Sequence, residues 1–172
     1  MKPAIWLCLL LAASLACIEL AAPSDGPAPI RTDAVEYKLQ AGPTGYTATI
    51  DFVFTNPRQA SVYIVNCNGI APPTLEKFVH GAWVRAWSGI VPECLSPPIV
   101  ISGGGQYHRA LHVFAGYPAT NSYPKFETPG IDGEYRMVWT YVLGSFDVQT
   151  YPFGEQLPLE QRISNPFTLA AP

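Results

Sequence analysis

The chain has 172 residues, of which 10 are basic and 13 acidic, so its net charge at neutral pH is −3. This balance argues against nucleic acid as a partner and provides no basic patch for an anionic membrane surface. Charged residues make up 13% of the sequence, about half the share of a typical soluble domain, whereas proline (18) and glycine (14) are plentiful. Few charges and many turn formers favour a single β-rich domain that works outside the cytoplasm.

The N-terminus has the pattern of an export signal. Lys2 precedes an apolar run at residues 5–15, which is too short to span a bilayer and is followed by Cys17. We therefore assign residues 1–16 to a signal peptide. The Ala- and Pro-rich stretch that follows has no periodicity and predicts a flexible tether over residues 17–32.

The four cysteines have separate predicted roles. Cys8 lies within the signal peptide and leaves with it. In an oxidising compartment Cys67 and Cys94 are the natural pair, and closing this loop would stabilise the fold by roughly 3–4 kcal/mol on the chain-entropy model. Cys17 then has no partner at the start of the mature chain, which predicts attachment of a diacylglyceryl group and anchoring to a membrane. An ordinary signal peptidase would also accept the residues before Cys17 and would leave it as an unmodified N-terminus.

Beyond the tether the sequence predicts about nine short strands. In residues 47–55 apolar and polar side chains alternate, which is the pattern of a half-buried strand. His80 and Gly81 join two strand-like runs and predict a tight hairpin turn. No segment has the apolar spacing of a long helix, although residues 157–163 fit a single turn. The other runs are rich in β-branched and aromatic residues and cover residues 35–40, 61–67, 75–79, 82–87, 98–102, 107–114, 134–143 and 166–170.

Strands without helices predict an antiparallel sandwich of two sheets, because a single sheet could not bury both of its faces. Tyr135 follows the turn at residues 129–133, as the tyrosine of the tyrosine corner does in immunoglobulin-like domains. The predicted fold class is therefore all-β, an immunoglobulin-like sandwich of about 7–9 strands over residues 33–172. A different all-β sandwich or a barrel is the alternative.

Several short phrases of the sequence resemble those of a known group of proteins. The phrases are Phe54-Thr55-Asn56-Pro57, Val62 to Cys67, Leu75-Glu76-Lys77, Gly81-Ala82-Trp83-Val84, Gly133 to Arg136 and Ser164 to Thr168. Together they resemble the immunoglobulin-like domains of bacterial envelope lipoproteins, a group loosely similar to the intracellular proteinase inhibitor family of bacilli, over about residues 33–170. The resemblance implies an immunoglobulin-like fold in the envelope and, for part of the group, inhibitor activity. Cys67 and Cys94 are too close in sequence for the inter-sheet disulfide of antibody domains, so we expect them to staple a loop to the end of the Cys67 strand.

No group of residues has the spacing of a catalytic, cofactor or metal site. His108 and His112 would share a strand face but lie about 13 Å apart, too far to bind one metal ion. The glycines at residues 103–105 have neither a following helix nor a nearby lysine to hold a phosphate, and the carboxylates do not cluster. We therefore expect no metal, no cofactor and no enzymatic activity.

Trp83, Arg85 and Trp87 form the pattern that best suggests a binding surface. Alternate positions of a strand place both indoles and the guanidinium on one face, where they could stack a sugar ring or hold a peptide. The simpler interpretation is that both indoles pack in or over the sandwich edge with Arg85 across them. The loop at residues 144–158 carries several aromatic side chains and is likewise either a binding loop or a self-packed cover over the core.

These observations predict a non-catalytic, exported domain, anchored by lipid at Cys17 in the bacterial cell envelope, that binds or scaffolds an unidentified protein partner. A proteinase inhibitor that presents the loop around Cys94, pinned by a disulfide and prolines, is the first alternative. The second is a carbohydrate-binding module that uses Trp83 and Trp87.

Overall fold

The structure, a computed structural model, describes residues 27–172, so the predicted signal peptide and Cys17 lie outside it. In this range the chain forms strands and a single-turn 3-10 helix, η1 (Leu159–Gln161), with no α-helix. No helix in the same range is long and apolar enough to cross a membrane. The strands are β1 (Ile30–Thr32), β2 (Glu36–Lys38), β3 (Gln40–Ala41), β4 (Gly45–Thr55), β5 (Val62–Ile64), β6 (Thr74–Val79), β7 (Ala82–Trp87), β8 (Ile99–Ile101), β9 (Gln106–Gly116), β10 (Gly133–Val138), β11 (Val142–Leu143) and β12 (Phe167–Ala170).

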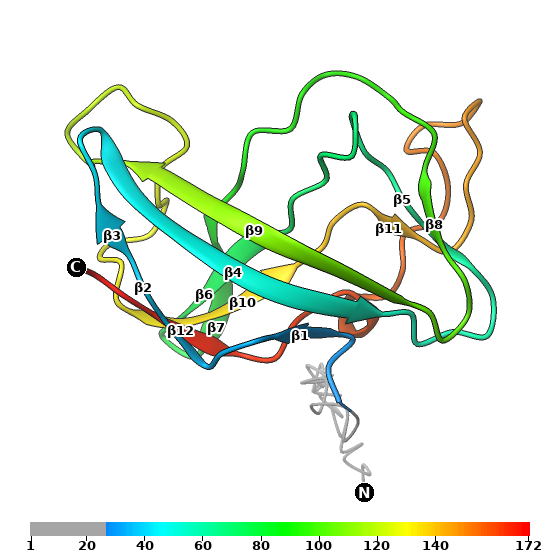
Figure 1. The fold of residues 1–172 in the computed structure, drawn as a ribbon, viewed down its shortest axis with the longest axis horizontal. Helices are drawn as coiled ribbons and strands as arrows, with labels where there is room; N and C mark the ends of the chain where they lie inside the picture. The colour runs from blue at the N-terminus through cyan, green and yellow to red at the C-terminus, as the bar shows by residue number, and fades with distance from the viewer. Residues whose placement is uncertain (1–26) are drawn as a thin grey trace, which may run out of the picture.

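The first sheet is built around the long pair β4 and β9 (Figure 1). These two strands are antiparallel along their full length of 11 residues each. β1 and β3 pair with the other edge of β4. The alternation predicted for residues 47–55 is confirmed, because Ile50, Phe52 and Phe54 are buried while the polar residues Thr47, Thr49, Asp51 and Thr55 are at least partly exposed.

The second sheet has the order β2-β12-β10-β6-β7, in which β2 is parallel to β12 and the other pairs are antiparallel. Tyr135 on β10 donates a hydrogen bond from its hydroxyl to the carbonyl of Ile131 at 2.6 Å, which forms the predicted tyrosine corner. Because the corner marks strand F, the order β12-β10-β6-β7 matches G-F-C-C′ of an immunoglobulin-like sandwich, and β4 and β9 take the places of B and E. The predicted fold class is confirmed.

The predicted hairpin at His80 and Gly81 is confirmed. These two residues join β6 to β7, with Val79 opposite Ala82. Both turn residues have positive φ, 51° and 86°. This is the backbone of a type I′ turn, whose twist matches that of the strands on either side.

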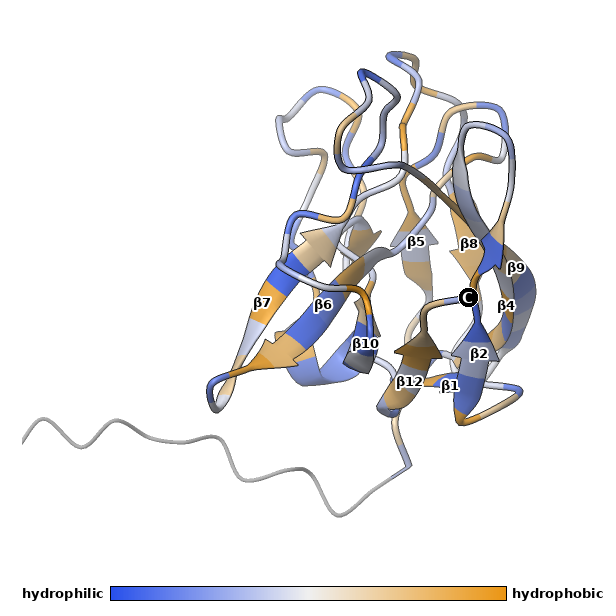
Figure 2. Cartoon of the chain, turned by 90° about the vertical axis from the view of Figure 1, so that its left-hand side faces the viewer, coloured by the Kyte–Doolittle hydropathy of each residue, from blue (hydrophilic) through white to orange (hydrophobic). Residues whose placement is uncertain are grey.

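The hydrophobic core lies between the two sheets. Figure 2 shows the two layers, with β6, β7 and β10 on one side and β4 and β9 on the other. Trp139 lies in this core, with its ring centre 5.5 Å from that of Phe52 and 5.8 Å from that of Phe54, both edge-on. Burying one large apolar side chain contributes about 1.5–3 kcal/mol, so the packing of these three rings contributes substantially to the stability of the fold.

A third, small sheet lies at one end of the sandwich, where Figure 1 shows β5, β8 and β11 together. Its strands belong to three different connections, those between β4 and β6, between β7 and β9, and between β10 and β12. The run at residues 134–143, predicted as one strand, is therefore divided. β10 ends at Val138, the N–H of Trp139 bonds to the carbonyl of Arg162, and the chain then turns into β11 of the third sheet. The single turn predicted at residues 157–163 is present as η1.

The folded part begins earlier than predicted. Residues 30–32, which the sequence assigned to the tether, form β1, and Ile30 is fully buried opposite Phe54. Three residues between a proline-rich stretch and Asp33 are too few to show a periodicity, so the sequence gives no strand signal there. β1 forms because the edge of β4 supplies its backbone with hydrogen-bond partners.

Candidate partner-binding site

The three residues of the predicted binding strip do not share one face of β7. Leu75 pairs with Trp87, whereas Glu76 pairs with Arg85, so Ala86 is the extra residue of a β-bulge. The bulge reverses the alternation, and Trp87 turns into the core with only 2% of its surface exposed. The prediction of a continuous strip was therefore wrong, because the period of two holds only along an unbroken ladder.

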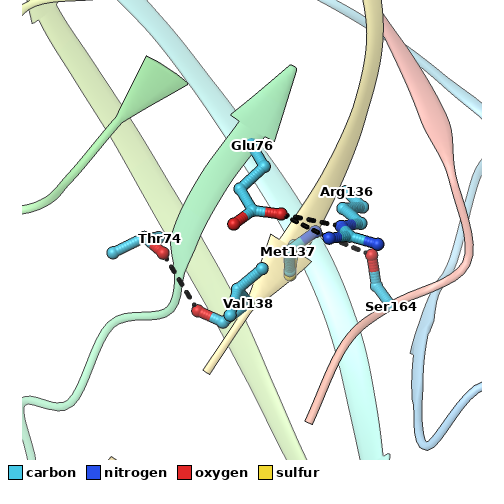
Figure 3. Close-up of polar contacts among 6 residues, drawn as sticks. All are labelled: Thr74, Glu76, Arg136, Met137, Val138 and Ser164. Atoms are coloured by element: carbon cyan, nitrogen blue, oxygen red, sulfur yellow. Dashed lines mark hydrogen bonds and ion pairs between the residues drawn. The ribbon is translucent and has the colours of Figure 1, made fainter. Parts of the chain in front are cut away.

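Trp83 and Arg85 remain on the outer face, and both are engaged there. Arg85 Nε lies 3.0 Å from Glu127 Oε2 in an exposed ion pair. The guanidinium carbon of Arg136 lies 4.6 Å from the centre of the Trp83 ring. Figure 3 shows Arg136 held by Glu76 of the neighbouring strand, with Nη2 to Oε2 at 2.7 Å. One side of the Trp83 ring is thus covered by protein, which weakens the case for a sugar-stacking surface.

The predicted disulfide between Cys67 and Cys94 is confirmed, with the two Cα atoms 5.1 Å apart. It fastens the loop after β7 to the chain just beyond β5, as expected. Further bonds hold the same loop, because Ser96 N–H donates to the carbonyl of Asn66 at 3.0 Å and the Asn66 side chain donates to the carbonyl of Pro97 at 2.9 Å. The Cys94 loop, residues 88–98, is therefore fixed at Cys94 and along its C-terminal part, while residues 90–95 are exposed.

Within residues 27–172, β9 is an edge strand that has a strand partner on one side only, in β4. On the side away from β4, two hydrogen bonds are formed near the C-terminal end of β9. The carbonyl of Phe114 accepts a bond from Trp87 Nε1 at 2.8 Å, and Gly116 N–H donates to the carbonyl of Pro124 at 2.8 Å. Both groups therefore point away from β4, and they identify which residues of β9 face the open side.

Residues two apart along a strand direct their backbone groups to the same side. The N–H and C=O groups of His108, Ala110 and His112 consequently point away from β4, as those of Phe114 and Gly116 do. Within residues 27–172 none of these three residues has a backbone partner on that side. This part of β9, which we call the open edge, is defined by residues 108–112.

An apolar cleft of about 560 Å³ lies beside the open edge. Besides β9, its lining comes mainly from residues 69–73, after the third sheet, and from residues 87–90, at the start of the Cys94 loop. Ile70 and Ile90 line it and are 45% and 69% exposed. Trp139 also lines it, and its buried Nε1–H has no acceptor among the described residues. Exposed apolar side chains gathered beside a concave surface are typical of a binding site.

Among the described residues, those that line the cleft include a cation and no acid, although the protein as a whole is acidic. Arg109 lines it, donates from Nε to the hydroxyl of Tyr107 at 2.5 Å and lies 4.8 Å from the centre of that ring. In the described part of the chain Arg109 forms no salt bridge. The rest of its guanidinium is available to an acceptor on a partner.

The histidines are spread over the surface of the described residues. His80 lies in the hairpin turn, while His108 and His112 are exposed on β9, where His112 Nδ1 is 3.2 Å from Thr49 Oγ1. In residues 27–172 no three His, Cys, Asp or Glu side chains are placed to hold a metal ion.

The perturbed ionisable groups belong to the framework of the fold. Burial raises the pKa of Tyr135, the residue of the tyrosine corner. Burial, followed by a hydrogen bond to Asp33, raises the pKa of Tyr37 to about 12. Burial lowers the pKa of Arg162. None of these three residues lines the cleft, so they supply no acid or base to it.

The aromatic residues of the loop at residues 144–158 pack on one another. Phe146 stacks on Tyr63 of β5 with ring centres 6.2 Å apart, Phe153 stacks on Phe146 at 6.4 Å, and Tyr151 meets Phe153 edge-on at 5.7 Å. Tyr151 is 89% exposed at the end of this row. Of the two interpretations of the loop, the rings thus favour a self-packed cover over the third sheet.

The sequence pointed to the Cys94 loop but not to the cleft. The feature that could have indicated the cleft is the predicted strand that contains His108, Arg109 and His112. Polar and charged side chains of this kind are typical of an edge strand. Which side of β9 stays open depends on connections far away in sequence, and strand composition does not report these.

The fold and the cleft together define an immunoglobulin-like sandwich with an open edge on the sheet of its strands B and E. Comparison with models of protein families, with characterised proteins and with solved structures found no match.

Proposed function

We propose that this protein is a non-catalytic domain, exported and lipid-anchored at Cys17 in the bacterial envelope, that binds a protein partner at the cleft beside the open edge of β9. The export pattern at residues 1–16 supports the location. The disulfide between Cys67 and Cys94 fits an oxidising compartment.

The observation that carries the proposal is the combination of an unpaired strand edge with an apolar cleft. Ile70 and Ile90 are exposed beside backbone groups that have no partner among the described residues. Exposed apolar surface and unpaired edges both favour association, and soluble proteins usually blunt them when they have no partner. A protein segment that covered the cleft would bury the exposed apolar side chains and would supply hydrogen-bond partners to the unpaired strand edge.

The test is site-specific photo-crosslinking in living cells. A photo-reactive amino acid at Ala110, on the open edge, is compared with one at Thr168, which is exposed on β12 in the other sheet. We expect one defined crosslinked protein from position 110, none from position 168, and loss of the crosslink when I90E is added. Equal crosslinking at the two positions, or no crosslink from position 110, would contradict the proposal.

A second candidate function is proteinase inhibition by the Cys94 loop. The loop supports it because it is exposed at residues 90–95 and is held by the disulfide at Cys94 and by the hydrogen bond from Asn66 to Pro97. Inhibitor loops gain affinity from such preorganisation. The test is a panel of serine and cysteine proteases at micromolar protein. Slowing of one protease that disappears in the C67S/C94S variant supports this function, and unchanged rates across the panel contradict it.

The carbohydrate-binding alternative has lost its structural support. It needs two indoles on one exposed face, whereas Trp87 is in the core and Trp83 is covered on one side by Arg136. We therefore do not propose it.

A further inference from the structure

We infer that the partner contributes an extended strand that pairs with the open edge of β9 and places a carboxylate beside Arg109. This inference rests on the proposed function and specifies the chemistry of its partner.

The backbone of β9 is prepared for one more strand. His108, Ala110 and His112 direct their N–H and C=O groups outward, and none of them is a proline. Trp87 Nε1 occupies the carbonyl of Phe114, which closes the edge at its C-terminal end. An extended peptide laid along residues 108–112 would complete a ladder of main-chain hydrogen bonds, which is the known mode of β-strand addition.

The side chains of β9 set the pattern that the added strand should have. Leu111 and Val113 are buried and Tyr107 is half-buried, so the odd-numbered residues, Arg109 among them, face inward, whereas His108, Ala110 and His112 are exposed on the outer face. Directly opposed residues on neighbouring strands share a face. Every second side chain of the added strand would therefore enter the cleft, where apolar groups meet apolar lining.

The charge of the cleft favours an acidic residue at the inward position nearest Arg109. No aspartate or glutamate lines the cleft, and Arg109 has no acidic partner in residues 27–172. Its Nε is held by Tyr107, which fixes the direction of the guanidinium. A carboxylate that met the remaining N–H groups would form a charge-assisted hydrogen bond.

The same charge argues against a second copy of this chain as the added strand. Two β9 strands paired edge to edge would bring the Arg109 side chains of both copies into one ladder. Like charges opposite each other destabilise a strand pair, and the ladder would contain no carboxylate to offset them. The structure thus points to a different chain whose strand is apolar and acidic.

The test uses a synthetic peptide and the mature protein in detergent. The acetylated and amidated peptide has about seven residues, in which valine and threonine alternate and the central inward residue is glutamate. Matched peptides carry glutamine or lysine at the centre. Binding is followed by amide hydrogen exchange resolved by residue.

The expected result is new protection of the amides of His108, Ala110 and His112. Those of Arg109 and Leu111, which already face β4, should change little. The glutamate peptide should bind about 5-fold more tightly than the glutamine peptide, and R109E should reverse the preference to lysine. R109Q, which removes the charge without inverting it, should remove the preference.

Each other outcome has a definite meaning. Protection without this alternation, or binding that ignores the substitutions at Arg109, overturns strand addition. If no peptide protects β9 while position 110 still crosslinks a partner in cells, the inference fails and the proposed function stands. If neither the peptides nor the crosslinker report contact at β9, both fail. If the β9 amides become protected as the protein concentration rises in the absence of peptide, a second copy of this chain is the occupant. That result would also overturn the inference.

Discussion

Replacing each of the two tryptophans of β7 by phenylalanine should separate their roles sharply. Trp87 is buried and donates to the carbonyl of Phe114 at 2.8 Å, so W87F leaves that carbonyl without its donor and removes buried atoms. An unsatisfied buried group costs about 1–3 kcal/mol, and the smaller ring adds about 1–2 kcal/mol for the residual cavity. We expect W87F to lower the free energy of unfolding by about 2–5 kcal/mol.

The control is W83F on the same strand. The Trp83 ring is half-buried on the outer face, and phenylalanine retains an aromatic surface for the Arg136 guanidinium, whose cation–π contact is worth about 0.5–1 kcal/mol at such a site. W83F should therefore cost no more than about 1 kcal/mol. The measurement is urea unfolding, with equal m-values required for a fair comparison. Equal losses in the two variants would refute the bulge as the element that sorts the indoles to opposite faces.

Three further predictions concern the disulfide, the tyrosine corner and the anchor. The C67S/C94S variant should lose roughly 3–4 kcal/mol of stability in denaturant unfolding and, unlike the native protein, should be insensitive to reductant; equal sensitivity would contradict this. Because the folded protein holds the proton of Tyr135 to higher pH than the unfolded chain, where tyrosine ionises near pH 10, stability should be full below about pH 10 and fall above it. Y135F should be less stable at neutral pH but decline less steeply in alkali, and parallel declines would exclude Tyr135 as the cause. Native protein should carry a diacylglyceryl group by mass spectrometry and sediment with membranes, whereas C17S should be released; an unmodified native N-terminus would exclude the anchor.

The sequence was sufficient for those features whose causes are local. The period of two in residues 47–55, the His80-Gly81 turn and the position of Tyr135 after its turn each depend on neighbours in the chain, and each has the predicted structure. The pairing of Cys67 with Cys94 followed from elimination and is also present.

The features that the sequence missed depend on partners distant in the chain. Trp87 looked equivalent to Trp83 because a bulge arises from the register with β6, which strand composition does not reveal. β1 is too short to show a pattern and exists through β4. The open edge is an extreme case, because it is defined by the lack of a neighbouring strand in the described part of the chain and not by the residues of β9 themselves.

The open edge has a cause in the connection between β7 and β9. In a seven-stranded immunoglobulin sandwich this stretch returns as strand D along strand E, and β9 holds the place of E. Here the stretch leads instead to the end of the molecule, where β8 pairs with β5 and Cys94 is bonded to Cys67. The disulfide and the third sheet therefore hold the connection away from β9. The same contacts that pin the Cys94 loop leave residues 108–112 open. The open edge and its cleft therefore result from the route of the connection between β7 and β9.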